Sequence, residues 1–351
     1  MIEATKEEVE KLFVQLQSLF TDGLITIVGS GLSCAEGLPS MGQLANELAV
    51  KVPTKISPAS LPLWKKIEAN LSTGVGLELA LQQDQPNEEV EQAVVKITAD
   101  FVQLKEYEVI GECVSSGRIL KFTHLLPHLS PTNPKIAKII TTNYDRLIEF
   151  AAERIGWGVD TMMLGRYWGI HSPEASDKSF VVNISQITKV PRLIYRNRIK
   201  LFKPHGSLDW YESTDGVISS VFPVNAQKVI ITPGLSKYKK GYETPFDAHR
   251  EQGNAAIDCA TGILCLGYGF NDEHLQTHLM TKLKKGTKGL LLTRSLSDNA
   301  RAVISVAPNF LALSAYTEGN VSGTLITQSK GESVISNVNY WDIEQFVKGV
   351  L

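Results

Sequence analysis

Apolar residues recur along the chain at two spacings, one typical of helices and one typical of buried strands. Residues 5–20 carry apolar side chains every three or four positions, which predicts an amphipathic helix. The apolar run at 24–28 predicts a strand, and residues 41–51 predict a helix. The segment between them, "GSGLSCAEGLPS", is rich in glycine and is expected to form the turn that joins the two.

The order strand, turn, helix recurs later in the chain. In "KIAKIITTNYDRLIEFAAERI" the strand is expected to end at Thr141 or Thr142, before a helix that starts near Asp145. The same order is found in "TGILCLGYGFNDEHLQTHLMTKLKK" and "KGLLLTRSLSDNARAVISVA". Strands that alternate with helices predict an α/β fold built on a Rossmann-like, doubly wound parallel sheet.

Three other regions complete the prediction of a single domain over residues 1–351. Residues 52–130 begin with prolines and glycines and continue as a long helical pattern, which indicates a helical insertion or cap. Strands are expected in "IKLFKPHGSLDWY" and "KVIITPG", whereas 156–200 has no clear pattern. Residues 300–351 are interpreted as a C-terminal extension with short strands and a final helix.

Composition and charge narrow the class of protein. The 351 residues are 43% apolar and 21% charged, with a net charge of −2, which is typical of soluble globular proteins and gives no support to nucleic-acid binding. One basic run is interpreted as a solvated face or a contact with an acidic partner protein. It comprises Arg192, Arg196, Arg198, Lys200 and Lys203, with the lysines of "KYKKG" and "KLKKGTK". Direct nucleic-acid binding would need a steep salt dependence to be credible.

The four cysteines point to a reducing compartment. No two have the C-x-x-C spacing of a zinc ribbon, and the set does not form a disulfide framework, so no metal is expected. The charged N-terminal segment has no signal-peptide core, and no apolar run approaches the roughly 18 residues of a membrane helix. We therefore expect a cytoplasmic protein.

Candidate chemistry lies where the strands end, since ligands of open α/β sheets bind beyond the carboxyl ends of the strands. Gly29 and Gly31 follow the first strand and would let the backbone approach a pyrophosphate, although such a turn is as often only structural. Asn143 could hydrogen-bond a ribose hydroxyl or a water. Asp145 is more typical of a helix cap.

Two further motifs follow later strands. In "KPHGS", His205 could serve as a general base near neutral pH, although a single histidine is more often structural. In "GYGFND", Gly267 and Gly269 form a second phosphate- or ribose-type turn, and Asp272 stands where a helix cap would. The weaker motif "LLLTRS", which contains Ser295, could meet an adenosine group.

Together and in this order, "GSGLSCAEGLPS", "TTNYD", "KPHGS" and "GYGFND" resemble the NAD-binding fold of sirtuins. More narrowly, they resemble the bacterial sirtuin-like domains of anti-phage defence proteins, over about residues 20–300. The resemblance implies that Asn143 and His205 are catalytic. It implies that these residues bind NAD+: Gly29, Ser30, Gly31, Ser33, Gly37, Pro39, Asp145, Gly267, Tyr268, Asp272 and Ser295. Tyr268 and Asp272 would lie near the adenosine ribose.

The chain departs from sirtuin deacylases in three places. It lacks their four zinc-binding cysteines, Thr142 replaces the glutamine before Asn143, and Leu38-Pro39 is followed by Ser40-Met41-Gly42 where a Phe-Arg pair is usual. A protein deacylase and a non-catalytic NAD or ADP-ribose sensor remain alternatives.

The resemblance therefore implies an NAD+ glycohydrolase that uses NAD+ as its substrate and depletes it during anti-phage defence. A hydride-transferring enzyme would typically show G-x-G-x-x-G with an acidic residue about 20 positions on. An unregulated NADase would harm its own cell, so control by homo-oligomerisation or by a HerA-type ATPase acting in trans is expected.

Overall fold

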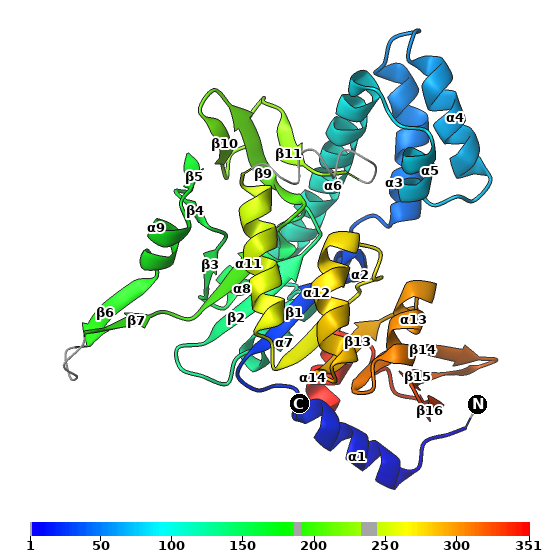
Figure 1. Ribbon diagram of the computed structural model, residues 1–351, viewed down its shortest axis with the longest axis vertical. Coiled ribbons are helices and arrows are strands. Elements are labelled where there is room, and N and C mark those ends of the chain that lie inside the picture. Colours follow the sequence, from blue (N-terminus) through cyan, green and yellow to red (C-terminus); the bar gives the residue numbers. More distant parts are fainter. Residues whose placement is uncertain (1, 186–190, 233–243) are drawn as a thin grey trace.

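A nine-stranded sheet forms the centre of the computed structural model, which describes residues 2–185, 191–232 and 244–351 (Figure 1). Its strand order is β16-β15-β14-β13-β12-β1-β2-β8-β3. The strands are β1 (Leu24–Val28), β2 (Ile136–Thr141), β3 (Gly158–Asp160), β8 (Arg198–Phe202), β12 (Gly262–Leu266), β13 (Lys288–Thr293), β14 (Phe310–Glu318), β15 (Val321–Gln328) and β16 (Gly331–Ser336). In this order, all neighbours from β14 across to β3 pair in parallel. The pairs β14–β15 and β15–β16 are antiparallel.

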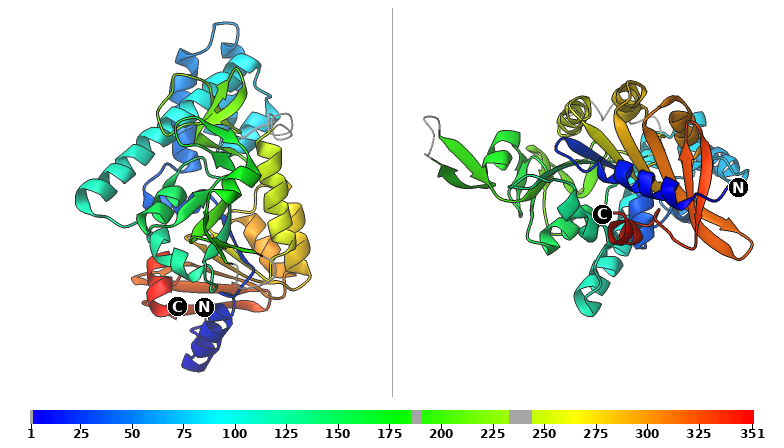
Figure 2. Two further views of the ribbon diagram at one scale, coloured as in Figure 1. Left: turned by 90° about the vertical axis from the view of Figure 1, so that its left-hand side faces the viewer. Right: turned by 90° about the horizontal axis from the view of Figure 1, so that it is seen from below.

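Helices cover both faces of this sheet, because alternate residues of each buried strand point to opposite faces. On β1, Leu24 and Val28 pack with helices α1 (Lys6–Gln17), α7 (Lys121–Leu125), α8 (Leu147–Arg154) and α14 (Ile343–Gly349). Ile25 and Ile27 pack instead with α11 (Phe246–Asp258), α12 (Glu273–Lys284) and α13 (Asp298–Val306). The view from below in Figure 2 shows these two helical layers with the sheet between them.

The strand order reverses between β1 and β12. The chain passes from β1 to β2, β3 and β8 on one side, and then crosses to β12, β13 and β14 on the other. In doubly wound sheets, ligands bind outside the carboxyl ends of the two strands at such a reversal. The segments that follow β1, β2, β8 and β12 therefore meet at the edge where a ligand is expected.

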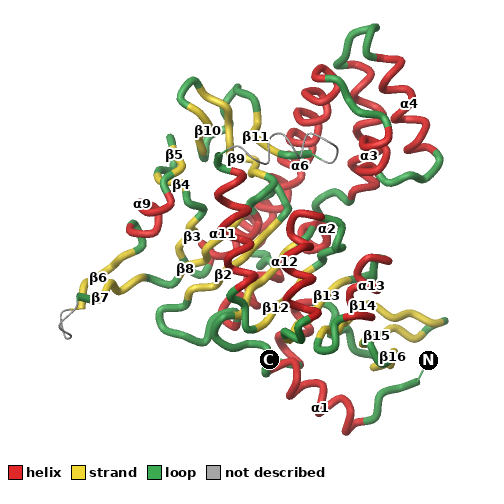
Figure 3. Tube along the Cα trace, in the orientation of Figure 1, coloured by secondary structure: helices red, strands yellow, loops and turns green. Residues whose placement is uncertain are grey.

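A helical region projects beyond this edge (Figure 3). It consists of α3 (Met41–Lys51), α4 (Leu61–Ser72), α5 (Leu77–Gln83) and the 29-residue α6 (Glu88–Ser116), with a short 3-10 helix at Val52–Thr54. A second 3-10 helix, Leu126–His128, follows α7. The region has its own apolar core around Leu48, Trp64, Ile67 and Val90.

The remaining strands lie to the other side of the molecule in Figure 1. A five-stranded sheet, in the order β11-β9-β10-β5-β4, contains β4 (Met163–Leu164), β5 (Gly169–His171), β9 (Gly206–Ser213), β10 (Gly216–Ser219) and β11 (Lys228–Ile230). Beside α9 (Pro173–Lys178), β6 (Val181–Ser185) and β7 (Arg192–Tyr195) form a separate two-stranded hairpin.

The predicted α/β, doubly wound fold is confirmed, and the predicted strand 24–28 and helix 41–51 are found with those bounds. One prediction was wrong. The segment after β1 is not only a turn, because Ser30–Glu36 form helix α2. The last strands, β15 and β16, extend the parallel part of the sheet in antiparallel order, because short connections favour antiparallel hairpins. Within the described part of the chain, no helix has both the length and the apolar character needed to span a membrane.

Candidate functional site

A buried hydrogen-bond network joins the segments that follow β1 and β2. The Asn143 Nδ2 amide donates to the Gly29 carbonyl at 2.9 Å and to Ser33 Oγ at 2.8 Å. A carbonyl oxygen only accepts, so this contact fixes which end of the amide is nitrogen. Among the described residues, none donates to Asn143 Oδ1, which leaves this oxygen as the acceptor of the side chain that is open to a ligand.

Asp145 extends this network. Its Oδ2 accepts from Ser33 Oγ at 2.7 Å, and its Oδ1 accepts from the Leu147 backbone at 3.2 Å, next to the start of α8. One carboxylate therefore accepts from the first amide of the helix, whose N-cap residue is Arg146, and also supports the serine that holds Asn143. Burial raises the pKa of Asp145, and the nearby ammonium of Lys203 opposes this effect.

Lys203 connects the segments after β2 and β8 although it is completely buried. Its Nζ donates to the Asp145 carbonyl at 2.6 Å and to Glu149 Oε1 at 2.8 Å. Burial raises the pKa of Glu149 to about 7, and the charge of Lys203 limits the rise. A buried ammonium needs partners of this kind, so Lys203 ties the turn that carries Asn143 to the strand end that carries His205.

His205 lies directly before β9, in the short link between β8 and β9, with 12% of its side chain exposed. Its backbone carbonyl accepts from the Ile231 amide at 2.9 Å. Its Nε2 lies 2.6 Å from Asp272 Oδ2. Asp272 is itself buried and accepts from the Leu275 backbone at 3.2 Å, which makes it the cap of α12.

The glycines after β1 and β12 allow two backbone turns to touch. A Cβ on Gly29 would lie 2.5 Å from the Gly267 carbonyl oxygen, and one on Gly31 would lie 2.7 Å from Gly267 Cα. Gly267 also has a φ of +53°, which favours glycine. The Gly31 amide donates to the Gly267 carbonyl and the Gly29 amide to Leu266. These contacts explain the glycines by packing, and the pyrophosphate role stays a prediction.

The other predicted binding residues are spread around this centre. Ser30 is exposed at the start of α2, and Gly37 ends that helix with a φ of +113°. The Pro39 carbonyl accepts from Cys34 Sγ at 3.6 Å. Tyr268 is buried, and burial together with the charge of Asp272 raises its pKa. Ser295 is exposed, and its carbonyl accepts from Thr293 Oγ1.

The helical region reaches the same turns, which sequence reasoning did not anticipate. Glu106 of α6 is fully buried and binds the guanidinium and backbone amide of Arg146, the residue after Asp145. Glu36, at the end of α2, pairs with Arg118 at 2.8 Å. Glu78 of α5 helps to raise the pKa of Tyr268. The spacing of charged residues along a predicted helix does not indicate which residues they pair with in the folded chain.

The basic run is only in part the solvated face that the sequence suggested. Exposed members are Arg192, Arg196, Lys284, Lys285 and Lys288. Arg198 and Lys203 are instead buried, because β8 is an inner strand of the sheet. Arg198 and Lys200 both bind Asp177, at 2.8 and 2.6 Å. The lysines of "KYKKG" lie outside the described residues. The run therefore divides between exposed side chains and internal ion pairs.

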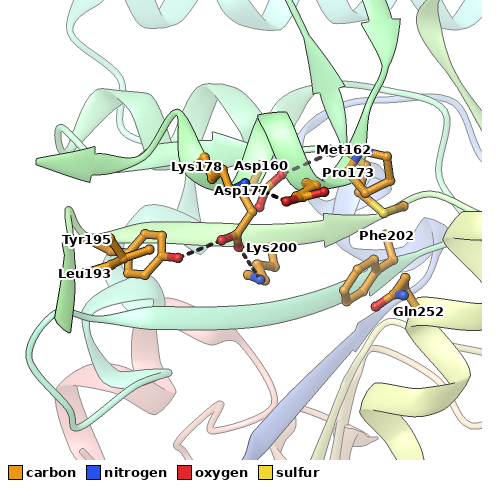
Figure 4. A pocket seen from close by; sticks show the side chains of 11 residues that line it. Asp160, Met162, Pro173, Asp177, Lys178, Leu193, Tyr195, Lys200, Phe202 and Gln252 are labelled. Atoms are coloured by element: carbon orange, nitrogen blue, oxygen red, sulfur yellow. Dashed lines mark hydrogen bonds and ion pairs between the residues drawn. The ribbon is translucent and has the colours of Figure 1, made fainter. Parts of the chain in front are cut away.

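A pocket of about 340 Å³ lies away from the predicted site, beside β8 and the β6–β7 hairpin (Figure 4). Asp177 accepts there from Tyr195 Oη at 2.8 Å and from Lys200, and none of the predicted site residues lines the pocket. All four cysteines are free thiols, and over residues 2–185, 191–232 and 244–351 no three His, Cys, Asp or Glu side chains are grouped as metal ligands.

One family model matches part of the chain. Residues 137–304 match the model described as SIR2-like domain. That span contains Asn143, His205 and Asp272. A comparison with curated proteins found no match.

Several solved structures are similar to the chain. A Sir2 homologue in complex with NAD is 14% identical, over 89% of this chain and 90% of that one, with a TM-score of 0.40. A Sir2 homologue mutant with ADP-ribose is 13% identical, over 83% and 87%, with a TM-score of 0.42. A structure from work on sirtuin substrate affinity is 13% identical, over 99% and 98%, with a TM-score of 0.41.

Proposed function

We propose that this protein hydrolyses the N-glycosidic bond between nicotinamide and ribose in NAD+, giving nicotinamide and ADP-ribose. The observation that carries the proposal is the fixed amide of Asn143. Its nitrogen is held by Gly29 and Ser33, and its oxygen remains to accept from a ribose hydroxyl or a water. His205 follows the neighbouring strand and supplies a base. The match of 137–304 to the SIR2-like domain supports NAD+ as the ligand.

For this hydrolysis the protein must hold NAD+ and a water molecule in a reactive geometry and supply one group that accepts a proton. As the C1′–N bond breaks, nicotinamide leaves as a neutral base and positive charge develops on the ribose. A water oxygen bonds to C1′ and loses one proton to His205. Asn143 would orient that water or the ribose hydroxyls, an effect of holding the reactants in a productive geometry. General-base catalysis typically contributes about 10²–10⁴-fold, which sets the expected effect of removing His205.

The test is incubation of purified protein with NAD+, with and without acetyl-lysine peptide, followed by separation of the products by chromatography. We expect nicotinamide and ADP-ribose without peptide. His205→Ala should lower kcat by about 10²–10⁴-fold, and Asn143→Ala should lower kcat more than it raises KM. His278→Ala is the matched control, because His278 also pairs with an aspartate, Asp258 at 2.9 Å, but is exposed.

Each alternative gives a different result. NAD+ consumption that requires the peptide would identify a deacylase, and a cyclic product would identify a cyclase. Binding of NAD+ without cleavage would identify a sensor or an enzyme that lacks its activator. A His205→Ala variant that keeps wild-type turnover would refute the proposed base.

The resemblance to anti-phage defence proteins supports a wider proposal about control. The NADase would act in the cytoplasm and remain silent until homo-oligomerisation or a HerA-type ATPase activates it. Size-exclusion chromatography at micromolar concentration, with and without such an ATPase, tests both routes. A monomer whose NAD+ turnover is unchanged under all conditions would contradict them.

A further inference from the structure

Asp272 makes two contacts with its two carboxylate oxygens. Oδ1 accepts from the Leu275 backbone amide at 3.2 Å and caps α12. Oδ2 lies 2.6 Å from His205 Nε2. Capping of α12 needs only one of the two carboxylate oxygens, so the other oxygen can interact with His205. The resemblance to sirtuins implied a place near the adenosine ribose for Asp272, and the structure brings its carboxylate to His205, the predicted base.

We propose that Asp272 is a positioning residue that orients His205 and fixes which ring nitrogen accepts the proton. This inference rests on the proposed function. A carboxylate accepts, so Nε2 carries the hydrogen in the neutral ring and Nδ1 keeps the lone pair. Among the described residues, none forms a hydrogen bond with Nδ1. Nδ1 therefore takes the proton from water during hydrolysis, and the carboxylate stabilises the imidazolium that results.

The surroundings favour this arrangement. His205 and Asp272 are both largely shielded from solvent, which strengthens the attraction between carboxylate and imidazolium. Burial raises the pKa of the neighbouring Tyr268, and the negative charge of Asp272 raises it further, so this phenol stays neutral.

Two substitutions separate positioning from capping. Asp272→Asn keeps an oxygen for the Leu275 amide, but it removes the charge and the acceptor at Nε2. Asp272→Ser also keeps a good cap residue, and its side chain is too short to reach His205 as the carboxylate does. Both variants should keep α12 intact, so their thermal midpoints should stay close to that of the wild type.

The experiment records ¹⁵N NMR spectra of the wild type and both variants with labelled histidine. His205→Ala identifies the His205 signals among the seven histidines. With the carboxylate in place, we expect the neutral ring to carry its hydrogen on Nε2. Both variants should lose this preference, so the ¹⁵N signals of Nδ1 and Nε2 should move toward each other or exchange positions. We expect kcat to fall at least about 10²-fold, with little change in KM.

Unchanged ¹⁵N signals of the His205 ring in both variants, or a kcat close to that of the wild type, would overturn the inference and leave Asp272 as a cap. A lowered thermal midpoint with unchanged ¹⁵N signals would have the same meaning. If wild-type protein does not cleave NAD+, the proposed function fails on its own. The NMR spectra then still decide whether Asp272 controls which ring nitrogen of His205 carries the hydrogen.

Discussion

At the scale of single residues, the candidate site is defined by polar side chains that are buried and hydrogen-bonded to one another. Ser33, Asn143, Asp145 and Lys203 are all buried, and each has partners from a different segment of the chain. A buried polar group without partners costs free energy, so these side chains hold one another in place. The two atoms that this network leaves for a ligand, Asn143 Oδ1 and His205 Nδ1, are an acceptor and a base.

The glycines of "GYG" give a prediction at this scale. Gly267→Ala should lower the free energy of unfolding by several kcal/mol, because its Cβ would lie 2.6 Å from the Gly31 backbone at a φ of +53°. Gly269→Ala is the control, since its nearest neighbour is the Asn271 side chain at 3.3 Å. Urea unfolding of both variants checks the difference. Similar losses in the two would show that the contact between the turns is unimportant.

At the scale of elements, the sequence predicts those helices and strands that the local spacing of apolar residues determines. The strand Leu24–Val28 and the helix Met41–Lys51 follow from apolar runs and periodicity. The helix Ser30–Glu36 was missed because Gly29 at its N-cap and Gly31 in its first turn argue against a helix, whereas contact with Gly267 stabilises it. Strands β3, β4 and β5 have two or three residues each, which is too short for a periodic signal.

The residues of the candidate site could likewise be predicted only where a local motif indicates them. Asn143 and His205 could be recognised because each follows a strand and matches a motif. The pairing of His205 with Asp272, and the link from Lys203 to Asp145, join residues that are far apart in the chain. Neither can be read from spacing, because the fold alone brings these segments together.

The link between α6 and the turn after β2 gives a prediction at the element scale. Glu106→Ala should destabilise the protein by about 3–5 kcal/mol, because it leaves the Arg146 guanidinium largely buried without its carboxylate. It should also lower kcat, since Arg146 follows Asp145. Glu112→Ala on the same helix should cost no more than about 1 kcal/mol, because its pair with Arg118 is exposed.

Denaturant unfolding and NAD+ turnover measure the two effects of these variants. Glu106→Gln, which keeps an oxygen for the Arg146 amide, provides a milder variant should Glu106→Ala fail to fold. If Glu106→Gln changed neither stability nor turnover, α6 would be only a neighbour of the site.

At the scale of the whole molecule, the site joins parts with separate cores. Asn143 and His205 follow strands of the sheet, Asp272 begins a helix on one face of the sheet, and Glu106 comes from the helical region. A ligand at this edge would contact segments from several of these parts. Its binding should therefore stabilise the folded chain as a whole, beyond the strands that it touches.

The rise in Tm on addition of NAD+ measures how strongly ligand binding stabilises the whole chain. In His205→Ala, which should bind NAD+ without consuming it, ligand at 100 times its Kd should add about 2.7 kcal/mol to the free energy of unfolding. For a chain of 351 residues this corresponds to a rise in Tm of about 4 °C. Asn143→Ala should show a smaller rise if Oδ1 contacts the ribose, and nicotinamide alone should have little effect because it spans one end of the site. No rise at millimolar NAD+ in a well-folded His205→Ala variant would argue that this edge of the sheet does not bind the dinucleotide.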